Sequence, residues 1–404
     1  MLHVNTKDNE NRRRRRDRPL GLSNRKGTNL KVCPYSVVFG GDFQVKKILS
    51  LLVIVFVVIS LKEDAGAFEF KGFANIDFET VKGSDNNEHK YGSFIVGGMD
   101  LYISEVINDR LDILGEILID PEEGLIDLER FHVGYIFVDA IKIRAGRFHT
   151  PLGFWNISYH HGAQLQPTID RPEILKFEDD GGVLPTHTIG INAVGRFKAG
   201  DSVFMYDIML GNGDQIIEDD NNDILLYPNV DSDNNSNKSI AFSFSAKPGF
   251  LQNLKVGISG NYQRVHSKEG LLVDGSPVDI DILQTIIVPA FLFNVNGFEI
   301  GGDYFYIRNK DKNGIDEDKI NNGYYILLTY SLNEQWMPYV LTESRNVEAG
   351  DKYFSALSSG DLNETIVGIK YNTNYRSCIK AEGRLVDDDN DKYNEYAIQW
   401  AVSF

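Results

Sequence analysis

Apolar and polar residues alternate along most of the chain after residue 68, with a period of two residues. Side chains point to opposite faces along a strand, so this pattern predicts strands with one apolar face and one polar face. Helical periodicity of useful length is not found in this part of the sequence. We predict sixteen strands, at 69–79, 92–105, 110–119, 125–137, 140–149, 188–198, 202–211, 239–247, 254–265, 283–294, 298–308, 323–332, 335–344, 364–372, 375–386 and 393–404.

The last of these segments carries the clearest alternation. Tyr396, Ile398, Trp400, Val402 and Phe404 share one parity, and small or polar residues share the other. Chain ends usually fray, so a strong strand pattern at the final residue calls for an explanation. A closed barrel provides it, because the last strand of a barrel pairs with the first and leaves no edge. We take Trp400 and Phe404 as the candidate assembly signal.

The connections between the predicted strands alternate in length. The short ones are 106–109, 138–139, 199–201, 248–253, 295–297, 333–334 and 373–374. The long and polar ones are 80–91, 120–124, 150–187, 212–238, 266–282, 309–322, 345–363 and 387–392, of which only 120–124 is brief. Tight periplasmic turns and long external loops are typical of outer-membrane barrels. The prediction is therefore a 16-stranded antiparallel transmembrane β-barrel with both termini at the periplasmic rim.

The parity of each strand separates the predicted outer wall from the lumen. In 125–137 the residues Phe131, Val133, Tyr135 and Phe137 face out, which leaves Arg130 and His132 inside. The same argument places four more charged residues inside, from the two neighbouring strands: Asp112, Glu116, Lys142 and Arg144. A soluble sandwich or propeller would instead bury the apolar parity as a dry core. The loop rhythm, the export signal described next and the final Phe favour the barrel.

One continuous apolar run, 48–61, stands near the N-terminus. Lys46 and Lys47 precede it and Ala65-Gly66-Ala67 follows it, so residues 46–67 match a secretory signal peptide cleaved after Ala67. A single membrane anchor is the alternative, although the run is short for a span. Residues 1–45, with the basic block 12–16, form a prefix that is unstructured or not translated if synthesis starts at Val45.

Composition and charge narrow the classes of function. Of the 404 residues 42% are hydrophobic and the mean hydropathy is −0.25, which excludes a bundle of membrane helices. Residues 1–67 hold 13 of the 41 Lys and Arg and 6 of the 58 Asp and Glu, so residues 68–404 keep 28 and 52 and a net charge of −24. Nucleic acid is not expected as a partner. After cleavage Cys378 is the one remaining cysteine, which excludes an internal disulfide.

The 150–187 connection differs from the other long ones because it contains aromatic residues, apolar clusters and four prolines. A long loop of this composition is expected to fold inward and narrow the lumen. We expect its charges to oppose Lys142 and Arg144 on the wall, with the acidic stretch 178–180 facing those two bases. The predicted constriction residues from the loop and its flanks are Arg147, His149, His160, His161, Asp170, Arg171, Glu178, Asp179 and Asp180.

The stretch "IKIRAGRFHTPLGFWN", Ile141 to Asn156, resembles the phosphate-selective porin O and P family and its porin-like relatives. The resemblance implies a sixteen-stranded barrel, often trimeric, whose inward loop sets selectivity. Phosphate selectivity in that family depends on a ladder of basic luminal residues. This chain has Lys142, Arg144, Arg147 and Arg171 nearby but also many carboxylates, so the porin character is carried over and the phosphate specificity is not.

Some polar loop residues could form a catalytic site or a calcium site instead of plain solvated loops. His160 and His161, with Asp170 and Ser158 nearby, suggest a hydrolase at the barrel rim, but adjacent side chains on an extended chain point apart and a third member is missing. The acidic stretches 231–237, 311–318 and 387–391 suggest calcium, yet 231–237 begins a loop without the expected glycine and glutamate. No cofactor is predicted. The alternative is a divalent cation that binds at these external loops and crosslinks them to anionic lipid.

The sequence thus predicts an outer-membrane porin for passive diffusion of small hydrophilic solutes or ions, without enzymatic activity. The expected partners are outer-membrane lipid, the barrel insertion machinery, the diffusing solutes and further copies of the chain in a homotrimer. A surface adhesin or anchor, which needs only the loops, and a rim hydrolase are the alternatives.

Overall fold

The computed structural model describes residues 69–83, 89–121, 125–138, 140–159, 162–178, 180–219, 223–229, 233, 237–273, 276–277, 279–313, 317–389 and 391–404. All of these belong to one compact unit. The predicted prefix 1–45, the predicted signal peptide 46–67 and the site residues His160, His161 and Asp179 lie outside the described residues. So do most of 231–237 and parts of 311–318 and 387–391, the stretches considered for calcium.

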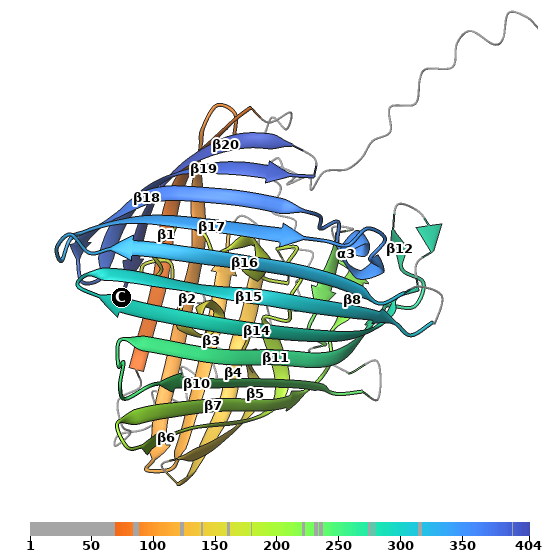
Figure 1. Ribbon diagram of the computed structural model, residues 1–404, viewed down its shortest axis with the longest axis horizontal. Coiled ribbons are helices and arrows are strands. Elements are labelled where there is room, and N and C mark those ends of the chain that lie inside the picture. The colour runs from red at the N-terminus through yellow and green to blue at the C-terminus, as the bar shows by residue number, and fades with distance from the viewer. Residues whose placement is uncertain are drawn as a thin grey trace, which may run out of the picture. The chain divides into compact units, whose positions relative to one another are not determined.

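Sixteen antiparallel strands form a closed barrel, as the alternation predicts (Figure 1). They are β1 (Glu69–Lys82), β2 (Ser93–Asn108), β3 (Leu111–Asp120), β4 (Leu125–Val138), β5 (Ile141–His149), β6 (His187–Ala199), β7 (Ser202–Gly211), β10 (Ser239–Lys247), β11 (Leu254–Ser267), β14 (Asp281–Val295), β15 (Phe298–Asp311), β16 (Lys319–Tyr330), β17 (Trp336–Asn346), β18 (Leu362–Asn374), β19 (Ser377–Asp388) and β20 (Lys392–Ser403). Several strands run a few residues beyond their predicted ends. At the rims the strands are still paired where the apolar–polar alternation of their residues has already weakened.

The barrel closes between its first and last strands, as predicted. β1 and β20 pair from Phe73 opposite Ser403 to Lys82 opposite Asn394. Phe404 extends this seam, because its N–H donates to the Gly72 carbonyl and its carbonyl accepts from the Gly72 N–H, both at 3.0 Å. A Cβ on residue 72 would lie 2.5 Å from the Phe404 ring, so the glycine makes room for the terminal aromatic side chain.

The short connections are tight turns set by asparagine and glycine. Asn108 Oδ1 accepts hydrogen bonds from the N–H groups of Arg110 and Leu111 at 2.9 and 3.0 Å, which shapes the β2–β3 turn. Asn333 repeats this arrangement between β16 and β17. Between β14 and β15, Asn296 and Gly297 both have positive φ, the requirement of a two-residue hairpin turn. These local choices determine the register of the strands on either side.

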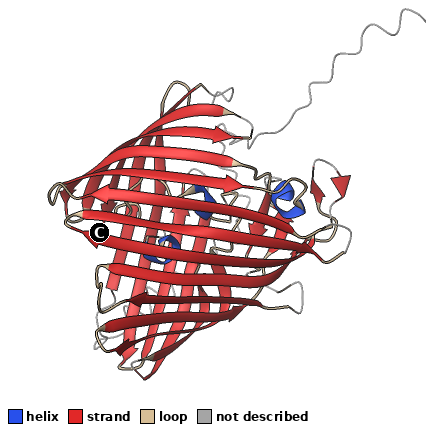
Figure 2. Ribbon diagram, viewed as in Figure 1, coloured by secondary structure: helices blue, strands red, loops and turns tan. Residues whose placement is uncertain are grey.

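The long connections carry the remaining elements, which the sequence did not predict (Figure 2). They are α2 (Trp155–Ser158), η1 (Glu173–Leu175), β8 (Gln215–Glu218), β9 (Ile224–Tyr227), β12 (Leu272–Val273), β13 (Ser276–Pro277) and α3 (Lys352–Ala356). Asp351 caps α3 by accepting from the N–H groups of Tyr353 and Phe354. Within the described ranges, no helix has the length and apolar character to cross a membrane.

The inward and outward parities agree with the prediction on β3, β4 and β5. Phe131, Val133, Tyr135 and Phe137 are exposed on the outer face of β4. On the inner face, Arg130 pairs with Glu116 across β3 and β4, and the Lys142 Nζ atom lies 2.5 Å from an Asp112 carboxylate oxygen. The barrel therefore has an apolar outer wall and a charged inner wall on this side.

Candidate functional site in the barrel interior

The 150–187 loop enters the barrel at the Pro-Leu-Gly-Phe-Trp part of its motif. Gly153 has φ of +68°, and a Cβ there would lie 2.3 Å from an oxygen of Asp303 on β15. Its N–H donates to Ser259 Oγ on β11 at 2.9 Å, and the next N–H, of Phe154, donates to Asp303 Oδ2 at 2.9 Å. Only glycine allows the backbone to approach the wall so closely in this conformation. The motif therefore docks the loop on the inner faces of β11 and β15.

Asn156 ties the two ends of the loop together. Its Nδ2 donates to the carbonyls of Thr150 and Thr186 at 3.1 and 3.2 Å, and its Oδ1 accepts from Arg171 at 3.1 Å. The Arg171 guanidinium also stacks over the Phe177 ring at 3.7 Å. Arg171, predicted at the constriction, thus braces the inside of the loop through these two contacts.

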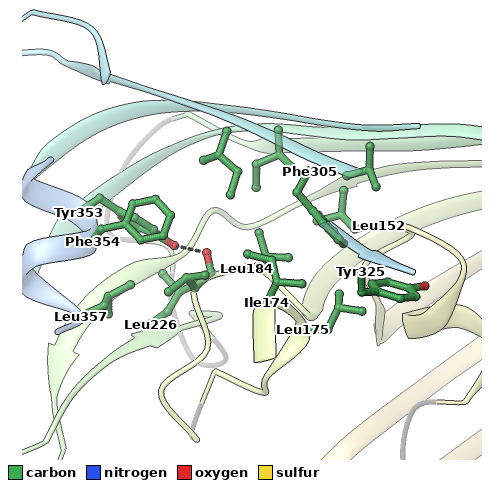
Figure 3. Packing of buried hydrophobic residues seen from close by; sticks show 14 of the residues in the cluster. Leu152, Ile174, Leu175, Leu184, Leu226, Phe305, Tyr325, Tyr353, Phe354 and Leu357 are labelled. Atoms are coloured by element: carbon green, nitrogen blue, oxygen red, sulfur yellow. Dashed lines mark hydrogen bonds between the residues drawn. The ribbon is translucent and has the colours of Figure 1, made fainter. Parts of the chain in front are cut away.

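In the half of the barrel interior that faces β14–β17, apolar side chains of the loop pack together (Figure 3). Leu152, Trp155, Ile174, Leu175 and Leu184 are buried among inner-face residues of β14–β17. β8, β9 and α3 cover the cluster, and the Tyr353 hydroxyl donates to the Val183 carbonyl at 2.8 Å. Burying a large apolar side chain contributes ~1.5–3 kcal/mol. This half is therefore a packed core; its members in the strands and covering elements include Ile216, Leu226, Ile286, Val288, Phe305, Tyr325, Leu341, Tyr353 and Phe354.

In the other half, on β3–β7, the inner wall carries ion pairs, some of which keep part of their surface accessible to water. The side chains of Lys142 and Asp112 keep 29% and 21% of their surface exposed. Arg144 donates to Asn192 at 2.8 Å and lies 3.4 Å from Asp207 on β7, and Arg147 lies 3.0 Å from Asp127 on β4. The predicted wall bases therefore pair with carboxylates of the wall. Among the described residues their partners are Asp112, Asp207 and Asp127, so the expected opposition to the acidic stretch 178–180 is not observed.

Glu178 is buried at the end of the loop. Its carboxylate accepts from the His187 N–H at 2.7 Å and from the Thr186 hydroxyl, and it lies 3.1 Å from His187 Nδ1. The other ring nitrogen of His187 lies 2.8 Å from Glu129 on β4. Burial alone would raise the pKa of Glu178, but His187 outweighs it and lowers that pKa below its usual value. Glu178 therefore anchors the loop to the wall.

Asp170 and Asp180 remain accessible within the loop. The Asp170 side chain is 52% exposed, yet one of its oxygens accepts from Arg384 on β19. Enclosure by the barrel wall partly desolvates Asp170 and raises its pKa, but the Arg384 charge lowers that pKa by more. Burial raises the pKa of Asp180, and Lys176 opposes that effect. These two carboxylates are the predicted loop charges that face accessible space among the residues described.

Three carboxylates converge inside the barrel, and two of them, Glu79 and Glu395, are not among the predicted site residues. Oxygens of Glu79 on β1, Asp170 and Glu395 on β20 all lie within 4.8 Å of one another. Arg384 Nη1 lies 3.4 Å from Glu395, so a cation of the wall partly neutralises the group. Inward parity next to the closing strand is the signal that could have identified Glu79 and Glu395.

Comparisons with known proteins support the barrel fold. No family model matches the chain. A search of curated proteins likewise found no match. A solved structure of a loop-deletion mutant of OmpT, an outer membrane protein of Vibrio cholerae, aligns with a TM-score of 0.58 at 15% identity, over 84% of this chain and 100% of that one. The anion-selective porin from Comamonas acidovorans aligns at 0.56 and 12%, over 84% and 99%.

A third neighbour is the outer membrane channel DcaP of Acinetobacter baumannii, with a TM-score of 0.54 at 11% identity over 85% of this chain and 99% of that one. Identities this low establish likeness of fold alone. The likeness to the phosphate-selective O and P family remains an expectation based on the Ile141–Asn156 motif. The chain has the porin-like form of a closed 16-stranded antiparallel β-barrel.

Proposed function

We propose that this protein is an outer-membrane porin whose barrel encloses a water-filled channel for passive diffusion of small hydrophilic solutes or ions. One observation carries the proposal: the inner wall from β3 to β7 bears paired charges whose side chains stay accessible to water. Charged side chains are costly in a sealed interior, whereas they are usual along an aqueous pore. The apolar outer face of the same strands fits contact with lipid.

The channel occupies the charged half of the interior and is narrowed by the 150–187 loop. Support comes from the packed core of Leu152, Trp155 and Leu184, which fills the opposite half. Asp170, Lys176 and Asp180 line the loop side of the constriction, and Arg130, Lys142 and Arg144 line the wall side. Arg171 and Glu178 brace the loop through Asn156 and His187. On the wall, Arg147 pairs with Asp127, and Glu116 holds Arg130.

A mild preference for cations follows from the charges. Residues 68–404 carry a net charge of −24, and Glu79, Asp170 and Glu395 converge on the lumen. Arg384 limits the field of these three carboxylates, so the preference is modest.

Single-channel recording in a planar bilayer tests the proposal. Purified barrels should produce discrete conductance steps, and a salt gradient should give a reversal potential of the sign expected for cations. Folded barrels that insert but produce no steps would refute the channel and leave the adhesin hypothesis. A rim hydrolase gains no support from Asp170, because its carboxylate is engaged by Arg384 on the inner wall.

Export and assembly complete the proposal. We expect cleavage after Ala67, which N-terminal sequencing of membrane-extracted protein tests; an N-terminus before residue 65 would refute it. A homotrimer is the expected assembly, and one solved OmpT neighbour is described as a trimer form. Chemical crosslinking in native membranes should trap three copies, and monomers alone would refute the assembly.

A further inference from the structure

The loop is held on the wall opposite to its origin. It leaves the barrel after β5 and returns at β6, whereas its 163–170 segment contacts β18 and β19. Along the strand order β18 lies seven strands from β5 in one direction and nine in the other. The loop therefore crosses the lumen, and its far end depends on residues distant in sequence.

Two buried lysines hold the backbone of this segment. Lys380 donates to the carbonyls of Ala163 and Thr168, both at 2.6 Å, and to Gln399 Oε1 at 2.8 Å. Lys370 donates to three consecutive carbonyls, of residues 164, 165 and 166, at 2.6, 3.2 and 3.2 Å. Each ammonium thus uses all three of its N–H bonds. Four of these carbonyls, of residues 163–166, belong to a turn at 162–166, where helix-like carbonyls otherwise lack partners.

An acid and a base on β19 continue the attachment. Glu382 Oε2 accepts from the Ile169 N–H at 3.0 Å and from the Tyr339 hydroxyl at 2.7 Å. Arg384 bonds both Glu382 and Asp170. All four charged side chains lie on the buried inner parity of β18 and β19, and Lys380 has no exposed surface.

We propose that Lys370, Lys380, Glu382 and Arg384 form a clamp that fixes the 163–170 segment across the lumen and thereby sets the width of the channel. The clamp consists of positioning residues, because they act through the loop. This inference rests on the proposed porin function for its effect on conductance. The attachment itself can be tested without that function.

The buried Cys378 thiol can report whether the 163–170 segment is attached to the wall. Cys378 has no exposed surface, and its Sγ lies 3.8 Å from the Gln164 carbonyl, beneath the clamped segment. A thiol in this position reacts only when the segment lifts, so its reaction rate measures loop opening. A charged, water-soluble methanethiosulfonate serves as the probe on the mature barrel in detergent or liposomes.

The main variant is Lys370→Met with Lys380→Met, which keeps the side-chain length and removes six donors. We expect Cys378 to react about tenfold faster and the single-channel conductance to rise, because buried carbonyls that lose their partners favour the open loop. Lys142→Met is the matched control for the thiol rate, since Lys142 contacts Asp112 on its own wall. Folding of every variant is checked by heat-modifiable mobility on a gel.

If the double variant does not fold, a second pair of variants tests whether the clamp holds the 163–170 segment. Arg384→Gln should expose Cys378, and Arg384→Lys, which keeps a cation opposite Asp170, should restore its protection. Unchanged thiol rates in folded variants would overturn the clamp. If Cys378 reacts faster but the conductance is unchanged, the clamp does not control the width of the channel. A parent barrel without conductance would refute the porin function, while the thiol rates would still test the clamp.

Discussion

The two halves of the barrel interior differ in what faces them. On β14–β17 the inner face carries apolar side chains that meet the apolar residues of the 150–187 loop, as Phe305 and Leu184 illustrate (Figure 3). On β3–β7 the inner face carries charged side chains that pair along the wall, as Lys142 and Asp112 do. The loop therefore packs onto the first half and leaves the charged wall of the second half partly exposed. In the proposed porin, the distribution of apolar residues sets the position of the channel, and the wall charges set its selectivity.

A charge placed in the packed half should change the conductance and the stability of the barrel more than the other substitutions below. Leu184→Asp puts an unpaired carboxylate into the apolar cluster, at an expected cost of about 3–5 kcal/mol. The loop should leave this half, so that conductance rises and the gel-shift temperature of the barrel falls. Ile157→Asp is the control, because Ile157 is exposed on α2. Equal behaviour of the two variants would contradict a packed core.

Removing the terminal residue tests how the two halves are joined. Deletion of Phe404 eliminates the paired hydrogen bonds with Gly72 and the ring contact with Phe70 at the seam. The amount of folded barrel in the outer membrane should fall several-fold, because an open edge is not tolerated in lipid. Trimming residues 387–391 is the comparison and should have little effect. Equal yields would show that Phe404 is dispensable.

Neutral substitutions at the converging carboxylates of β1 and β20 should change the ion selectivity without changing packing. Glu79→Gln with Glu395→Gln removes two of the three converging carboxylates. The reversal potential in a salt gradient should then shift toward anions, with near-normal conductance. Glu69→Gln with Glu334→Gln makes the same change at exposed positions and should shift it less. A larger shift in the control would place the selective region elsewhere.

The smallest effect concerns acid pH. Because the pKa of Glu178 is lowered, its ionised anchor contributes fully above the unfolded value of about 4.3 and is lost as the pH falls through the lower folded value. Each unit of lowering corresponds to about 1.4 kcal/mol. Thermal unfolding at graded pH should therefore show a smaller loss below about pH 4 for Glu178→Gln than for the parent. The ion pair of Asp170 with Arg384 also loses stability at acid pH, so the Glu178→Gln variant keeps part of the loss. If the variant and the parent show identical dependence of thermal stability on pH, Glu178 is not an anchor.

The barrel could be predicted from the sequence because its evidence is local. Alternation at Phe131, Val133 and Tyr135 specifies the outer face of a strand by itself, and the Asn296-Gly297 pair specifies a hairpin. Strand order then follows from short connections. Closure follows from the terminal alternation that ends at Phe404.

The interior could not be predicted in the same way, because its contacts join distant residues. Lys380 and Lys142 have the same inward parity, yet the first clamps a loop more than two hundred residues away and the second pairs within the wall. Charge complementarity alone predicts that 178–180 faces Lys142 and Arg144. Glu178 is instead buried with His187, because a carboxylate that accepts several hydrogen bonds is stable without water.

The claim that permeation is confined to the charged half has one direct test. In a Cys378→Ser background, single cysteines are placed at Lys142 in the charged half and at Val288, which is buried in the packed half. A charged thiol reagent added to open channels should reduce the current through Lys142→Cys and leave Val288→Cys unaffected. Equal block of both variants, or block of Val288→Cys alone, would contradict the account.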